Sequence, residues 1–252
     1  MHWAVAREAL DIVGLLRTGS DAVRVWYDAT MAYLQTARDY ASLMPHLKQA
    51  RAEFPADARV FLFSGAASEN LTAPPVQAAV EELRVPIAGL EKKDVLTKQA
   101  EAHYRRALAL DPSLALAQLR LGHLLGASGR ADEAAPLLAD AEAALTDPVT
   151  RYDAALFLGR AEEARGRDAE ARGAYERART RFPLAQSPAL ALAALQWKVG
   201  EQDAAADGVR ALARTNPMDT QSDPWWRYDI SHVSDVTALF AKLDDAVKKI
   251  MR

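Results

Sequence analysis

Histidine is the side chain that most often moves protons or binds metals near neutral pH. This chain of 252 residues has five: His2, His46, His103, His123 and His232. No two lie three or four positions apart, so no helix can bring two imidazoles onto one face. Asp229 lies three residues before His232, and this pair could orient an imidazole; the alternative is that Ser231 or Ser234 caps a following helix. We predict no catalytic residue and no metal site.

Adjacent acidic residues offer no better reaction centre. The pairs are Glu81-Glu82, Glu162-Glu163 and Asp244-Asp245. Neighbouring residues on a helix point about 100° apart, so the two carboxylates of a pair do not face a shared proton or ion. The sequence has no cysteine, no GxGxxG motif and no phosphate-binding loop. We therefore expect a protein that is not an enzyme and that has no cofactor.

The charge balance narrows the classes of partner. Thirty-one basic residues against 34 acidic ones give a formal net charge of −3, so nothing draws the whole chain to a phosphate backbone, and we expect no nucleic acid partner. No stretch approaches 18 uninterrupted apolar residues, and the first residues lack a basic segment before an apolar one. We expect no membrane insertion and a cytoplasmic location as written. A truncated N-terminus would leave a periplasmic or other location open.

Glycine, alanine and proline return in a fixed register along the second half of the chain. Gly129, Gly166 and Gly200 are each followed five residues later by alanine and then by a proline. The glycines are 37 and 34 residues apart. A period of this length is typical of stacked helical hairpins, in which each unit buries its apolar face against its neighbours.

The residues in this register resemble the tetratricopeptide repeat (TPR), a 34-residue helix-turn-helix unit. One unit matches without a gap through Leu158-Gly159, Gly166, Ala171, Tyr175, Ala178 and Phe182-Pro183. The preceding unit has Leu121-Gly122, and the following unit has Leu192-Ala193 at the positions of Leu158-Gly159. The resemblance implies an all-α protein: a right-handed α-solenoid of antiparallel helix hairpins, with about five units of bacterial type.

The register also predicts the organisation of the chain. Residues 1–23 are expected to form a helix of a preceding, truncated repeat, and residues 24–217 the TPR array. Gly65 and Ala100 are 35 residues apart where an ordinary repeat has 12, so an insertion of 23 residues is expected at about 70–95. Residues 218–252 are expected to form an aromatic loop and a capping helix, with Trp225 and Trp226 sealing the open end of the last hairpin.

The insertion is the first candidate for a binding site. Its prolines bound a short amphipathic helix that carries Val80 and Leu83. Because the insertion interrupts the turn between two helices of a hairpin, it is expected to project from one edge of the array, where loops often carry binding function. The alternative is that its apolar residues fold back and fill the groove.

The concave groove is the second candidate. In the family that this chain resembles, fixed positions of the first helix of each hairpin line this groove. Projected onto this sequence, they give Leu62, Leu119, Leu156 and Leu190, flanked by His123, Asp153, Arg160, Glu163, Trp197 and Lys198. The leucines would form an apolar ladder for a peptide or a helix, unless they pack against the next helix and only stabilise the stack.

Two functions remain from these observations. The first is a non-enzymatic interaction module or scaffold that binds a protein or peptide partner in its groove or through its insertion, with self-association left open. The second is the regulatory or recognition portion of a larger protein whose N-terminal domain carries an activity. The sequence does not name the partner.

Overall fold

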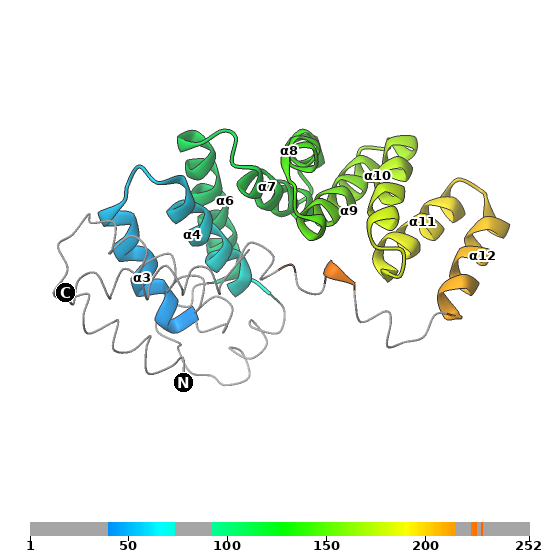
Figure 1. Ribbon diagram of the computed structural model, residues 1–252, viewed down its shortest axis with the longest axis horizontal. Helices are drawn as coiled ribbons and strands as arrows, with labels where there is room; N and C mark the ends of the chain where they lie inside the picture. Colours follow the sequence, from blue (N-terminus) through cyan, green and yellow to red (C-terminus); the bar gives the residue numbers. More distant parts are fainter. Residues whose placement is uncertain (1–39, 74–91, 215–222, 226–227, 229–252) are drawn as a thin grey trace. The chain divides into compact units, whose positions relative to one another are not determined.

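A computed structural model describes residues 40–73, 92–214, 223–225 and 228 of the chain (Figure 1). The predicted Val80, Leu83 and C-terminal capping helix therefore lie outside the described residues, as do Asp229 and His232. The chain divides into two units, one of residues 1–111 with 233–252 and one of residues 112–232.

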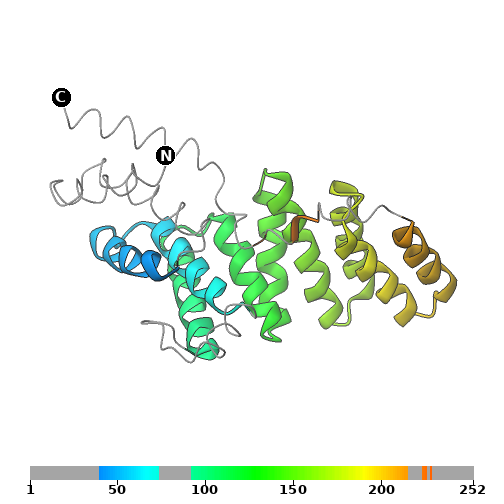
Figure 2. The same ribbon diagram turned by 90° about the horizontal axis from the view of Figure 1, so that it is seen from below.

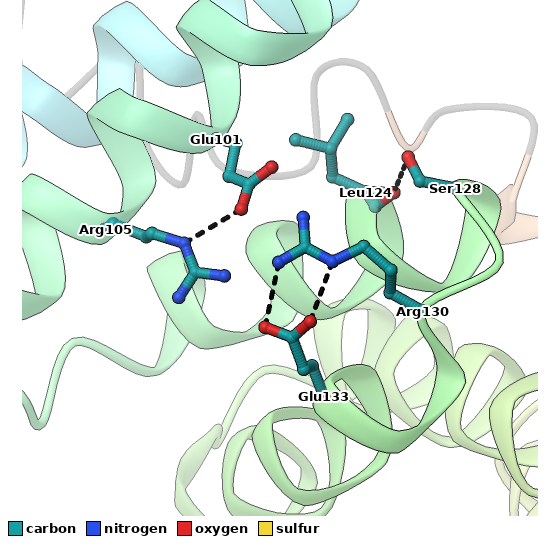
Figure 3. Close-up of polar contacts among 6 residues, drawn as sticks. All are labelled: Glu101, Arg105, Leu124, Ser128, Arg130 and Glu133. Carbon is teal, nitrogen blue, oxygen red and sulfur yellow. Dashed lines mark hydrogen bonds and ion pairs between the residues drawn. The ribbon is translucent and has the colours of Figure 1, made fainter.

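The first unit contains three described helices. They are α3 (Tyr40–Glu53), α4 (Ala58–Leu71) and α6 (Lys93–Leu110). Helix α4 packs against both α3 and α6. It begins at the N-cap Asp57, whose carboxylate accepts the Arg59 backbone N–H at 2.9 Å. Helix α6 contains the exposed Arg105–Glu101 ion pair of 2.9 Å, one helical turn apart (Figure 3).

The second unit contains three consecutive helix hairpins, shown in green to orange in Figures 1 and 2. They pair α7 (Ala115–Ala127) with α8 (Ala131–Ala144), α9 (Pro148–Ala164) with α10 (Asp168–Arg181), and α11 (Gln186–Lys198) with α12 (Gln202–Ala213). Contacts between α8 and α9 and between α10 and α11 join successive hairpins. The predicted all-α solenoid of antiparallel hairpins is confirmed.

The turn glycines close all three hairpins in the same way. Gly129, Gly166 and Gly200 have φ of 77°, 74° and 88°, a left-handed conformation that only glycine adopts without strain. The residue after each glycine donates its backbone N–H to the carbonyl five residues earlier, as in Arg130 to Leu125 at 2.9 Å. This is the Schellman ending of a helix, so the glycine stops the first helix of each hairpin and reverses the chain.

Side chains support the first of these turns, which Figure 3 shows. The Ser128 hydroxyl donates to the Leu124 carbonyl at 2.8 Å, near the end of α7. Arg130 binds both carboxylate oxygens of Glu133 at 2.7 and 2.9 Å, at the start of α8. An acidic residue in the first turn of α8 also complements the helix dipole.

The small residues of the register allow the two helices of a hairpin to approach closely. A Cβ added to Gly159 would overlap the Tyr175 ring, and one added to Gly65 would overlap the Tyr104 ring in the first unit. Both tyrosines are buried, and their hydroxyls donate to Glu163 at 2.8 Å and to Glu69 at 2.5 Å. The two glycine–tyrosine pairs are separated by 16 and 39 residues of sequence, a difference of 23. Helices α4 and α6 therefore form a hairpin of the same kind.

Ion pairs join neighbouring hairpins of the second unit. Glu142 of α8 accepts from Arg177 of α10 at 2.9 Å and from Arg181 at 3.1 Å. Lys198 of α11 donates to Asp168 of α10 at 2.7 Å. The Lys198–Asp168 pair is partly exposed and contributes little, about 0–1 kcal/mol. Glu142 is buried, so its two arginine partners keep a carboxylate satisfied away from water.

Candidate functional site

The predicted groove leucines do not form an open ladder. Leu62, Leu119 and Leu156 are buried, whereas Leu190 is 49% exposed. The buried three therefore pack inside the array, which is the stabilising alternative for these positions. Leu190 and Trp197 lie two turns apart on one face of α11, and Trp197 is 60% exposed. The prediction that these residues bind a partner stays a prediction.

The polar residues predicted to flank the groove likewise include both buried and exposed side chains. Arg160 is exposed and His123 half-buried, whereas Asp153 is fully buried. Glu163 accepts from Tyr175, and Lys198 pairs with Asp168, so both take part in contacts between helices.

A segment from the end of the second unit lies on the surface formed by the first helices of its hairpins. We call residues 223–225 and 228 the resident segment, and the surface that it contacts the first-helix face. That face is formed by α7, α9 and α11, and its contacting residues are Arg120, His123, Tyr152, Phe157, Arg160 and Ser187. Figure 2 shows residues 223–225 in orange against the helices of this unit.

Asp223 is the acidic anchor of the resident segment. One carboxylate oxygen accepts the Tyr152 hydroxyl of α9 at 2.7 Å, and the other accepts the Ser187 backbone N–H at 2.9 Å. Ser187 lies in the first turn of α11, where unpaired N–H groups and the helix dipole favour a negative charge. Asp223 is buried, so both bonds form away from water. Burial and the neighbouring Asp223 carboxylate together raise the pKa of Tyr152, so its hydroxyl remains a donor.

Aromatic rings form the second anchor. Trp225 and Tyr228 pack on His123 of α7 and Phe157 of α9, with ring centroids 4.7 to 5.6 Å apart. All four of these pairs meet edge to face, the arrangement that the ring quadrupole favours. Tyr228 is buried and Trp225 half-buried, so the cluster takes apolar area out of water.

Two arginines flank the rings. The Arg120 guanidinium is fully buried, lies 4.2 Å from the centroid of the Tyr228 ring and donates to the Tyr228 carbonyl at 2.6 Å. Arg160 lies 5.7 Å from the Trp225 ring at the surface. A cation over an aromatic face is attracted by its quadrupole, more strongly where water is excluded.

Asp153 is an unusual member of this region. Its side chain is buried on α9, and neither carboxylate oxygen has a hydrogen-bond partner among the described residues. Burial raises its pKa to about 8, against the opposing effect of the positive charge of Arg120. At neutral pH the Asp153 carboxyl is therefore mostly uncharged.

This raised pKa predicts a pH dependence of stability. The folded state holds the Asp153 proton up to about pH 8, whereas the unfolded chain loses it near its ordinary value of 3.8. The stabilising effect of the proton is therefore complete below pH 3.8 and is lost as pH rises through about 8. Asp153→Asn should remove this loss. The unfolding free energy of the variant, relative to wild type, should therefore increase with rising pH by up to about 1.4 kcal/mol per pH unit. Urea unfolding of both proteins at pH 5, 7 and 9 measures this difference in unfolding free energy. A difference that is the same at all three pH values would contradict the raised pKa of Asp153.

A small pocket adjoins the aromatic cluster. It has a volume of about 110 Å³ between α7 and α9, and its lining residues are Gly122, His123, Gly126, Ala127, Phe157, Arg160, Ala161 and Ala164. Most of the lining is small or apolar, with the His123 ring and the Arg160 guanidinium at the polar side. The pocket can hold an aliphatic side chain next to the resident segment.

The structure revises the role expected of Trp225. Its ring packs on helices of the first and second hairpins of this unit, so the prediction that it seals the last hairpin is wrong. The sequence prediction named His123 and Arg160 but missed Arg120, Tyr152 and Phe157. Arg120 and Phe157 each directly follow a predicted groove leucine, so the predicted positions were one residue before the residues that make the contacts.

Comparison with solved structures identifies the fold. The structure of MamA MSR-1 is 20% identical, with a TM-score of 0.56 over 77% of this chain and 96% of its own. "MamA 41-end" from Desulfovibrio magneticus RS-1 is 16% identical, with a TM-score of 0.57 over 81% of this chain and 97% of its own. No protein-family model and no curated protein matches the chain. With the turn glycines and the repeated hairpins, this likeness establishes a TPR-like α-solenoid.

None of the helices in the part of the chain that the structure describes combines the length and the apolar character needed to cross a membrane. Within the same ranges, no three His, Asp or Glu side chains are grouped so as to hold a metal ion.

Proposed function

We propose that this protein is a non-enzymatic scaffold that binds a segment of a protein partner on the first-helix face. One observation carries the proposal: a short segment of the chain itself is held on this face through a carboxylate, two aromatic rings and a carbonyl. A surface with hydrogen-bond donors, an aromatic platform and two arginines suits the recognition of successive side chains of a bound segment.

The exposed part of α11 supports the same proposal. Leu190 and Trp197 follow Ser187 along one side of the helix and present apolar area to water. Exposed large apolar residues that lie together are typical of interaction surfaces. These two side chains would extend the contact of a partner beyond the resident segment.

Site-specific photocrosslinking tests this function. A benzophenone amino acid is placed at Leu190 or Trp197 on the first-helix face, and at Glu176 or Arg179, which are exposed on α10, as controls. We expect positions 190 and 197 to give a discrete crosslinked protein, identified by mass spectrometry, that the α10 positions do not give. Equal crosslinking from all four positions, or none from any, would overturn the proposal.

A further inference from the structure

The resident segment carries the features of a bound ligand. Its anchors occur at Asp223, Trp225 and Tyr228, in the local sequence Asp-Pro-Trp-Trp-Arg-Tyr. Each anchor uses a different feature of the face: two hydrogen-bond donors for the carboxylate, an aromatic platform for the rings, and the Arg120 guanidinium for the Tyr228 carbonyl. The anchors also fix the spacing at which another chain would have to present the same groups.

The acidic anchor sets a requirement for charge. The Tyr152 hydroxyl and the Ser187 N–H are both donors, and Ser187 contributes the positive end of a helix dipole. A carboxylate satisfies both donors at once, and such charge-assisted hydrogen bonds are roughly twice as strong as neutral ones. Asp223 also accepts the Trp225 backbone N–H at 3.1 Å, which forms a tight turn between the acidic and the aromatic anchors.

The aromatic anchor sets a requirement for rings. His123 and Phe157 offer ring faces and edges, and Arg120 and Arg160 place positive charge over the rings of Tyr228 and Trp225. Aromatic residues in a ligand gain both apolar burial and cation–π attraction here, whereas an aliphatic residue gains only the first.

We propose that the resident segment is an intramolecular ligand that competes with an external segment of the same chemistry: an acidic residue followed by two aromatic residues at this spacing. This inference rests on the proposed function and names the kind of partner. Because the resident segment belongs to the same chain, it binds at an effective concentration on the order of millimolar. An external segment binds well only when it offers more contacts or when the resident segment has left.

The pocket of about 110 Å³ supplies such additional contacts. It shares His123, Phe157 and Arg160 with the platform under Trp225, and the resident segment leaves it open. A partner that adds an aliphatic side chain beside its aromatic anchor would fill it, at roughly 0.8 kcal/mol for each buried methylene group. Competition of this kind keeps the face covered until the partner arrives.

The test uses the full chain with its resident segment disabled. The triple variant Asp223→Ala, Trp225→Ala, Tyr228→Ala changes only the segment and leaves the first-helix face intact. The probe is a synthetic peptide of residues 219–232 of this chain, measured by calorimetry. We expect the triple variant to bind it with at least roughly 100-fold higher affinity than wild type. The same peptide with Asp223→Ala should bind the triple variant at least tenfold more weakly. Equal affinity of wild type and triple variant, or indifference to the acidic residue, would overturn the inference.

Circular dichroism shows whether the triple variant is folded. If it has lost the helical signal of wild type, Asp223→Asn takes its place, because it removes only the charge that the two donors bind. It should then bind the peptide at least tenfold more tightly than wild type, and an affinity equal to wild type again overturns the inference. A folded variant that ignores the peptide, while Leu190 and Trp197 still crosslink a partner, would refute the inference and leave the proposed function standing.

Discussion

Gly159→Ala is expected to destabilise the second unit by about 1–3 kcal/mol, although alanine is the better helix former by about 1 kcal/mol. The reason is the contact with Tyr175, whose buried ring occupies the space that the new methyl group needs. Neither residue can move freely, because the Tyr175 hydroxyl is bound to Glu163 on the same helix as Gly159. Denaturant unfolding, with hydrogen exchange to locate the loss in α9 and α10, measures the effect.

Gly173→Ala is the matched control. Gly173 lies in α10 of the same hairpin, and the nearest atom to an added Cβ is at 3.6 Å, in the flexible side chain of Arg177. This substitution should raise stability by up to about 1 kcal/mol through helix propensity alone.

A double mutant isolates the packing contact. With Tyr175→Leu already present, Gly159→Ala should cost at least about 1 kcal/mol less than in wild type, because the ring is gone. If both glycine substitutions shift stability in the same direction, close packing is not the reason for Gly159.

The repeat architecture could be predicted because its determinants are local and recur. Gly129, Gly166 and Gly200 each require a left-handed backbone at a helix end, and the same requirement at a period of 34 to 37 residues marks a stack of hairpins. The Gly159–Tyr175 contact is likewise fixed by one hairpin and therefore visible in the sequence of one unit. Its counterpart, Gly65–Tyr104, obeys the same rule across a longer connection.

The occupied first-helix face could not be predicted in the same way. Asp223 is 71 residues from Tyr152, and Tyr228 is 108 residues from Arg120, so neither contact follows from a helical period. The burial of Arg120 and Asp153 could not be predicted from the sequence either, since charged residues on a helix are usually exposed. The sequence feature that pointed to this segment was the density of aromatic residues at 225–228. It predicted an aromatic loop outside the repeat pattern but not the surface that this loop contacts.

Arg120→Met should cost about 3 kcal/mol at pH 7 and release the resident segment. The substitution keeps much of the apolar stem but removes the bond to the Tyr228 carbonyl and the cation beneath its ring. Arg160→Met is the control, because Arg160 also lies over a ring of the segment but is exposed; it should cost at most about 1 kcal/mol. Hydrogen exchange of a peptide spanning residues 219–232 should accelerate in the first variant and stay near wild type in the second. Equal protection in both would mean that Arg120 does not hold the segment.

The cost of Arg120→Met should also depend on pH, because Asp153 is its electrostatic neighbour. The positive charge of Arg120 lowers the pKa of Asp153, so its removal moves that pKa above the value of about 8. Wild type has lost the stabilising effect of the Asp153 proton once pH exceeds about 8, whereas the variant continues to lose stability at higher pH. The difference between the two proteins should therefore widen from pH 7 to pH 9, by at most about 1.4 kcal/mol per pH unit. Adding Asp153→Asn to both proteins should abolish the widening. If the widening persists when both proteins carry Asp153→Asn, a group other than the Asp153 carboxyl is responsible for it.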